Sequence, residues 1–227
     1  AEGEHLFVAT TRDAAGNEGP ASAPLAVRYV KAPHSLQLVT ATDSGTSSTD
    51  CITKINPPQI TGKARPGAVV QLFDGEVWVG EQTADDQGDW TITTTILSEG
   101  EHRLIARAVS ASGMSQPSSE LKITIDTTPP TLQLDRLFDH DVWYSDERLS
   151  GTIEDSNIDE IIYQFEAGAE LSLKLTDSYF QIARPSDYKA GEIRTLNLVV
   201  RDRAGNETIV DPIRFLVPVE LLVVDDD

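Results

Sequence analysis

Cysteine and positive charge are both scarce in this sequence. The 227 residues include one cysteine, Cys51, so the chain can form no internal disulfide and no cluster of cysteine metal ligands. Lysine and arginine number 18 against 37 aspartates and glutamates, and the formal net charge is -19. A surface of this sign repels nucleic-acid phosphates and anionic lipid headgroups, so we expect no nucleic-acid partner. The acidic surplus is typical of a soluble, self-repelling surface or of carboxylates grouped to hold Ca²⁺.

Long apolar runs are missing as well. No segment approaches the roughly 20 apolar residues of a membrane-spanning helix, and no basic region followed by an apolar core opens the chain. The sequence therefore predicts no membrane insertion. The hydrophobic content of 39% is nevertheless sufficient for packed cores. Because the chain begins at Ala1 without an initiating methionine, we expect it to be part of a longer protein.

The residue combinations that carry catalysis are also lacking. Nucleophilic and metal-assisted catalysis need histidine, cysteine or serine together with an oriented base, and the four histidines offer no such pairing: His5, His34, His102 and His140. His5 and His102 occupy equivalent positions of a repeat, which favours a role in a loop. The acidic group of Asp85, Asp86 and Asp89 is typical of a charged hairpin turn. We therefore predict that the chain is not an enzyme.

An internal repeat is the main positive signal. Glu2-Gly3-Glu4-His5 recurs 97 residues later as Glu99-Gly100-Glu101-His102, and each copy leads into an alternating apolar strand. Small-residue turns follow at 13–17, 110–114 and 202–206, separated by 92 to 97 residues. A module of this length is typical of an immunoglobulin-like β-sandwich.

The local pattern within one period is β throughout. Short runs rich in valine, isoleucine and threonine are broken by glycine, proline and aspartate, and no helix is needed. We expect strands at residues 35–40, 59–64, 69–73, 78–83, 90–95, 103–109 and 120–125. The predicted fold class is all-β, with tandem immunoglobulin-like β-sandwich modules arranged end to end.

Prolines mark the predicted module boundaries. They lie in Lys31-Ala32-Pro33 and in Asp126-Thr127-Thr128-Pro129-Pro130, where they forbid helix and stiffen the connection. We predict that residues 1–33 are the C-terminal part of a leading module, that 34–130 form a complete module, and that 131–227 form a second complete, divergent module. An isolated hairpin from the first segment would be marginally stable.

A set of motifs carries a family resemblance. They are Asp43-Ser44-Gly45 through Asp50, Ile52-Thr53, Pro58, Ile60-Thr61-Gly62, Pro66-Gly67-Ala68, Leu72-Phe73-Asp74-Gly75, Asp86-x-Gly88-x-Trp90 and Glu99-Gly100-Glu101-His102. The set resembles the bacterial immunoglobulin-like repeat of giant type I secreted surface adhesins of Gram-negative bacteria, the RTX or biofilm-associated type. The resemblance is close over residues 35–130, good over 1–33 and weaker over 131–217, where the Asp-x-Ala-Gly-Asn turn carries it.

This resemblance implies stacked β-sandwiches, calcium at module junctions and a secreted or cell-surface location. It also implies that the partners are neighbouring modules of the same chain and a host or biofilm-matrix ligand, with the chain itself a monomer. Two departures from the repeat are present. The turn at 110–114 lacks aspartate and asparagine, and Cys51 stands where the pattern has a polar residue or glycine.

Loop positions independently suggest where an ion could bind. In a sandwich that the chain enters at one end and leaves at the other, alternate loops lie at alternate ends, so the first loop of one module should face the last turn of the next. Calcium takes six to eight oxygen ligands, mostly from carboxylates, amides and backbone carbonyls. The predicted Ca²⁺ ligands are Asp43, Asp50, Asp126, Asp202 and Asn206.

Two alternatives to this calcium site stay open. Asp-Ser-Gly and Ala-Gly-Asn are also ordinary turn formers, whose side chains bond their own backbone. A second ion could lie in the divergent module at Asp139, Asp141 and Asp155, where solvated loop charge is an equal explanation.

The resemblance favours a structural extender of an adhesin, rigidified by calcium. A ligand-binding module near the adhesin tip is an alternative, and it predicts exposed aromatics around Trp143, Tyr144 and Tyr163. An accessory sandwich of a secreted hydrolase is the other alternative.

Overall fold

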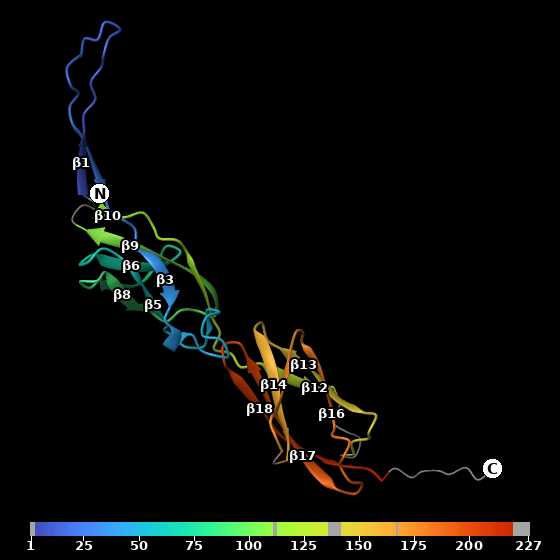
Figure 1. Cartoon of the computed structure of the whole chain (residues 1–227). Coiled ribbons are helices and arrows are strands. Elements are labelled where there is room, and N and C mark those ends of the chain that lie inside the picture. Colours follow the sequence, from blue (N-terminus) through green and yellow to red (C-terminus); the bar gives the residue numbers. More distant parts are fainter. Residues whose placement is uncertain (1–2, 111–112, 136–141, 167, 220–227) are drawn as a thin grey trace. The chain divides into compact units, whose positions relative to one another are not determined.

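The computed structural model describes residues 3–110, 113–135, 142–166 and 168–219 (Figure 1). They divide into two compact units. Unit 1 comprises residues 1–43 and 48–125, and unit 2 comprises residues 44–47 and 126–227. The described residues hold β-strands and a single 3-10 turn, Thr40–Thr42, and the predicted all-β fold class is confirmed. Among them, no helix has the length and apolar character needed to span a membrane.

Unit 1 contains a hairpin and two sheets. The hairpin pairs β1 (Gly3–Phe7) with β2 (Leu25–Tyr29) in antiparallel register. The larger sheet has the order β4 (Ile52–Thr53), β11 (Leu121–Ile125), β9 (Gly100–Ser110), β6 (Val69–Asp74) and β7 (Val77–Thr83), with β10 (Gly113–Met114) beside β9. The smaller sheet has the order β3 (His34–Leu38), β5 (Gln59–Lys63) and β8 (Asp89–Thr93). Each strand expected between residues 35 and 125 has a counterpart, and the short β4 and β10 are additional.

The core of unit 1 lies between these two sheets. Strand β6 alternates as a half-buried strand should: Val70 and Leu72 are fully buried, whereas Val69 and Gln71 are partly exposed. The smaller sheet contributes buried side chains from two strands to the same cluster, Ile60, Trp90 and Ile92. Face-to-face packing of two sheets is therefore what stabilises this unit.

His102 belongs to this buried face, and the expectation of a loop role is wrong for it. The residue lies in strand β9 with its side chain 7% exposed. Its Nδ1 lies 2.7 Å from Asp74 Oδ2, and its Nε2 lies 2.9 Å from the carbonyl oxygen of Ser98. Partners for both ring nitrogens let a polar ring occupy a core position.

Unit 2 is a second two-sheet sandwich. One sheet has the order β12 (Thr131–Leu134), β13 (Arg148–Glu154) and β16 (Tyr179–Ala183). The other has the order β15 (Leu171–Lys174), β14 (Ile158–Phe165), β17 (Ile193–Asp202) and β18 (Glu207–Leu216). Trp143 is fully buried between them, 4.9 Å from the Phe215 ring and 6.0 Å from the Phe165 ring. Trp143 therefore supplies core packing rather than an exposed aromatic surface.

Two equivalent turns contain glycines with positive φ. Gly16 follows β1 with φ 92°, and Gly205 connects β17 to β18 with φ 86°. Side chains with a Cβ are penalised in this region of backbone space. Both turns therefore favour glycine at this position.

We predict that Gly205→Val lowers the free energy of unfolding of unit 2 by about 1 kcal/mol or more, because valine is strained at positive φ. Thermal unfolding followed through the buried Trp143 measures the change. Gly16→Val is the matched control, since it introduces the same strain in the hairpin and should leave the unit 2 transition unchanged. An unchanged transition for Gly205→Val would contradict this account of the turn.

Candidate metal centre

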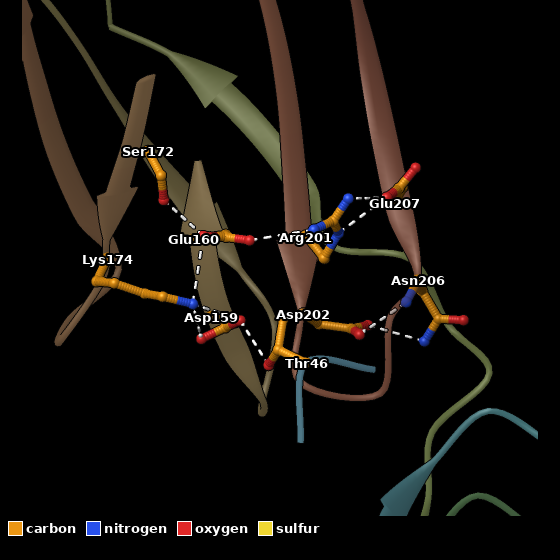
Figure 2. A network of polar contacts seen from close by, with 9 residues as sticks. All are labelled: Thr46, Asp159, Glu160, Ser172, Lys174, Arg201, Asp202, Asn206 and Glu207. Atoms are coloured by element: carbon orange, nitrogen blue, oxygen red, sulfur yellow. Dashed lines mark hydrogen bonds and ion pairs between the residues drawn. The ribbon is translucent and has the colours of Figure 1, made fainter. Parts of the chain in front are cut away.

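The turn between β17 and β18 is organised by one aspartate. Asp202 ends β17 and is fully buried. Its Oδ1 accepts a hydrogen bond from the backbone amide of Asn206 at 2.8 Å, and its Oδ2 accepts one from Asn206 Nδ2, also at 2.8 Å (Figure 2). The backbone amide of Asp202 donates to the Asn206 carbonyl at 3.2 Å. The side chains of the Asp-x-Ala-Gly-Asn motif thus close the turn on itself.

Asp126, the first residue of the long segment of unit 2, lies beside this turn. Asn206 Nδ2 also donates to the Asp126 carbonyl at 2.8 Å, and Asn157 Nδ2 donates to Asp126 Oδ2 at 2.6 Å. Asp126 is 5% exposed. Two asparagine amides therefore hold the first residue after unit 1 against the last turn of unit 2.

Asp155 brings a third carboxylate to the same place. It lies in the loop between β13 and β14, where its Oδ1 accepts a hydrogen bond from the Asn157 amide at 2.5 Å. One carboxylate oxygen from each of Asp126, Asp155 and Asp202 lies within 4.8 Å of the others. Three acidic groups from the linker, a loop and a strand end therefore converge.

Burial of these groups shifts their protonation. The pKa of Asp202 is raised above the ordinary 3.8, first because burial removes water from its charged form and further because of the charge on Asp126. Burial likewise raises the pKa of Asp155, and the charges of Asp126 and Asp202 add to the effect. Thr128, Asn157 and Asn206 donate hydrogen bonds to these carboxylates, and each of these donors is a neutral amide. These donors stabilise the carboxylates without neutralising their charge.

Glu160, in the same unit, shows how neighbouring cations affect the pKa of a buried carboxylate. Glu160 is 7% exposed, yet its pKa is lowered, first by the hydrogen bond from Ser172 and then by Lys174. Arg201 Nη1 lies 3.2 Å from Glu160 Oε1, and Lys174 Nζ lies 3.2 Å from Glu160 Oε2 (Figure 2). Arg201 also pairs with Glu207 at 2.6 Å. The arginine and lysine in this network neutralise Glu160 and its neighbours rather than the three clustered aspartates.

Residues 44–47 of unit 2 pack on the same turn. Ser44 Oγ donates to the Ala204 carbonyl at 2.6 Å, and Thr46 Oγ1 donates to Asp159 Oδ2 at 2.9 Å (Figure 2). Gly45 lies between them with φ 95°, and a Cβ there would come within 1.8 Å of the Arg203 carbonyl oxygen. Only glycine fits this close approach of two backbones.

The five predicted ligands are divided between the two units. Asp126, Asp202 and Asn206 come together in unit 2, and Asp43 and Asp50 belong to unit 1. Asp43 is buried, its Oδ2 accepts a hydrogen bond from the Cys51 amide at 3.3 Å, and burial raises its pKa. Asp50 Oδ1 accepts a hydrogen bond from the Ile52 amide at 3.2 Å.

Asp155 is not among the five predicted ligands. The sequence suggests it instead for a second ion site with Asp139 and Asp141, which lie outside the described residues. The spacing Asp155-x-Asn157 gave a usable signal, because an asparagine two residues after an acidic group in a strand-connecting loop can bind both that group and a neighbour.

An exposed copy of the turn separates turn chemistry from the acidic cluster. In the hairpin, Asp13 Oδ1 accepts from the Asn17 amide at 2.9 Å, and Asn17 Nδ2 donates to Asp13 Oδ2 at 2.8 Å. The pKa of Asp13 is lowered, first by the Asn17 side chain. Turn formation therefore accounts for the aspartate and asparagine of both motifs. It does not account for Asp126 and Asp155, which join the turn in unit 2.

We predict that Asp155→Asn raises the free energy of unfolding of unit 2 at pH 7 in the presence of EDTA, because it removes one of three clustered like charges and keeps an oxygen for the Asn157 amide. A raised folded-state pKa means that the native protein gains stability as the pH falls through that pKa toward 3.8. The advantage of the variant over the parent should therefore shrink over that window. Urea unfolding of both proteins between pH 7 and pH 4 measures it, and a variant less stable at pH 7 would contradict the prediction.

A comparison with protein families gives a match to the part of the chain that contains the first sandwich. Residues 30–127 match the family described as "Bacterial Ig-like domain". A curated relative, Bacillopeptidase F of Bacillus subtilis (strain 168), is 28% identical over 126 residues, which are 55% of this chain and 8% of that protein. The chain thus spans a small fraction of the relative that it matches.

Solved structures resemble the chain more distantly. The fibronectin(III)-like modules of Clostridium thermocellum CbhA align with a TM-score of 0.43 at 14% identity, over 81% of this chain and 94% of that one. A tetra-tandem repeat in the extending region of a large adhesion protein aligns with a TM-score of 0.34 at 17% identity, over 95% and 57%. The family match over residues 30–127 confirms the resemblance to a bacterial Ig-like repeat that the motifs indicate.

Proposed function

We propose that this chain is a spacer segment of a secreted bacterial cell-surface adhesin. We further propose that Asp126, Asp155 and Asp202 bind Ca²⁺, and that the ion immobilises Asp126 at the beginning of unit 2. The observation that carries the calcium part is the convergence of three carboxylates within 4.8 Å, with neutral hydrogen-bond donors around them. Calcium prefers carboxylate oxygens, and each aspartate offers two. Burial and, after it, mutual repulsion raise the pKa of Asp155 and Asp202, and an ion there would offset both effects by stabilising the charged carboxylates.

The place of the cluster in the chain supports a mechanical role. Asp126 follows directly on Ile125, the last residue of unit 1, and the connection continues through two prolines, Pro129 and Pro130. An ion bound to Asp126 and to the β17–β18 turn would immobilise the first residue of this short, stiff linker. The units have separate hydrophobic clusters, so the ion is not required for either to fold.

The expected energy is modest. If the affinity is that of extracellular calcium modules, with a dissociation constant on the order of 10⁻⁴ to 10⁻³ M, millimolar calcium stabilises unit 2 by roughly 0.4 to 1.4 kcal/mol. A stabilisation of this size is enough to restrict the conformations of the linker and too small to drive folding. Neighbouring modules of the same chain are the partners that this role requires.

A second candidate function is an accessory module of a hydrolase. The similarity to Bacillopeptidase F over 126 residues favours it. Both roles are non-catalytic for this chain, and the full-length sequence distinguishes them through the presence or absence of a catalytic domain. The ligand-binding alternative has less support. Of the three aromatics around which an exposed surface was expected, Tyr144 is 47% exposed, whereas Trp143 is fully buried and Tyr163 packs partly buried against the core.

We predict that calorimetry detects calcium binding to the whole chain at millimolar concentration, and that Asp202→Ala and Asp155→Asn abolish it. Asp13→Asn is the matched control, since it alters an equivalent turn that lacks the two additional carboxylates. Calcium should raise the unit 2 melting temperature of the parent and leave that of Asp155→Asn unchanged. Binding that survives both variants would place the ion elsewhere.

We also predict that removing calcium widens the distribution of lengths of the chain in solution, because the linker loses the ion that holds Asp126. Small-angle scattering with and without EDTA measures this width, and circular dichroism should hardly change because each unit keeps its own core. Asp202→Ala in calcium should resemble the parent in EDTA. Identical scattering in both conditions would mean that the prolines alone set the geometry of the linker.

A further inference from the structure

The hairpin of β1 and β2 has an apolar face that the described residues leave exposed. The register places His5 opposite Val27 and Phe7 opposite Leu25, so these four side chains share one face with Tyr29. Phe7 is 58% exposed, Leu25 64% and Tyr29 51%.

The opposite face has a different character. It contains an ion pair in which Arg28 Nε lies 3.0 Å from Glu4 Oε2. Leu6, which is 64% exposed, and Ala26 lie opposite each other on the same face. The ion pair therefore distinguishes this face from the one that contains Phe7, Leu25 and Tyr29.

The same hairpin occurs a second time inside unit 1. Strands β9 and β11 pair Gly100 with Ile125, His102 with Ile123 and Leu104 with Leu121. These pairs are the counterparts of Gly3 with Tyr29, His5 with Val27 and Phe7 with Leu25. The two hairpins therefore have equivalent positions at each step of the register.

The connections of the two hairpins also agree in detail. The Ala9 amide donates a hydrogen bond to Ser22 Oγ at 3.1 Å, and the Ser22 amide donates one to the Ala9 carbonyl at 2.8 Å. In the second hairpin the Ala106 amide donates to Ser118 Oγ at 3.0 Å, and the Ser118 amide donates to the Ala106 carbonyl at 2.9 Å. Equivalent serines thus shape both connections, and the similarity extends beyond the paired strands.

The second hairpin shows what covers such a face. The counterparts His102, Leu104, Ile123 and Ile125 are between 0% and 6% exposed. The apolar members of this group form one cluster with Ile60, Trp90 and Ile92 of β5 and β8. A three-stranded sheet with aliphatic and tryptophan side chains therefore covers the face in the copy that is buried.

We propose that the apolar face of the β1–β2 hairpin is an interaction surface for a second β-sheet of the same kind as β3-β5-β8, and that the two together make an immunoglobulin-like sandwich. The occupant is an aliphatic sheet, because the hairpin reproduces the register, the apolar face and the serine bonds of a hairpin that such a sheet covers. An isolated two-stranded hairpin is marginally stable in water, so binding of the sheet also stabilises β1 and β2.

A fusion protein tests this proposal with the chain's own residues. In this fusion, an additional copy of residues 34–98 is placed before Glu2. The chain then continues unchanged from Glu2 to Asp227, so that residues 34–98 also occur at their original place. Because Glu99-Gly100-Glu101-His102 and Glu2-Gly3-Glu4-His5 are identical, the junction keeps the native local sequence. Amide hydrogen exchange of β1 and β2 is compared between the fusion and the original chain. We expect exchange in both strands to slow at least tenfold in the fusion.

Substitutions on the two faces provide matched controls. Val27→Asp, on the apolar face, should abolish the added protection, whereas Ala26→Asp, on the opposite face, should preserve it. A second fusion with Phe7→Leu, Val27→Ile and Tyr29→Ile restores the side chains of the buried hairpin and removes misfit as a cause of failure.

The outcomes separate the proposal from its competitors. Protection in either fusion that is lost with a charge on the apolar face supports it. Fast exchange in both fusions overturns it. Protection in the original chain that increases with protein concentration would also overturn it, because a second copy of the hairpin would then be the occupant.

Discussion

Both units depend on the packing of two β-sheets face to face. Strands buried on one side must alternate, and β9 does so across its middle, where His102, Leu104, Ala106 and Ala108 are buried in turn. This packing leaves only the sheet ends for loops, since a buried loop would have unpaired backbone groups. Polar and charged side chains therefore gather where strands begin and end. The acidic cluster of unit 2 is a product of this constraint, because Asp155 follows β13 and Asp202 ends β17.

The cluster also shows how environment decides the chemistry of identical residue types. Asp13 and Asp202 make the same hydrogen bonds to an asparagine four residues later. Hydrogen bonds, first the one from the Asn17 side chain, lower the pKa of Asp13, whereas burial and then the charge of Asp126 raise the pKa of Asp202. Glu160 is buried too, but its partners Ser172 and Lys174 keep its charged form favourable. The convergence of three carboxylates, which turn geometry alone does not require, is what makes Asp126, Asp155 and Asp202 candidates for a cation.

The all-β fold class could be predicted from the sequence because the patterns that indicate it lie within short segments of the chain. Alternation within Val69–Asp74, the glycine at position 205 and the repeated Glu-Gly-Glu-His segment each reflect short-range constraints on the backbone. The site was harder to predict. Asp126 and Asp202 could be paired from loop positions, but Asp155 required knowing which loop of the divergent module lies beside the last turn. The burial of Trp143 likewise depends on Phe165 and Phe215, which are distant in sequence.

The position of residues 44–47 has a consequence for how such a chain could evolve. The segment follows the first strand of one sandwich, yet it packs as part of unit 2, where Gly45 leaves no room for a side chain against Arg203. A genetic duplication or deletion that cuts the chain at Asp126 would separate the second sandwich from four residues that complete it. The segment that a duplication would copy therefore differs from the set of residues that packs as one unit. We expect recombination between modules to be tolerated where the loop after the first strand keeps a glycine at the position of Gly45.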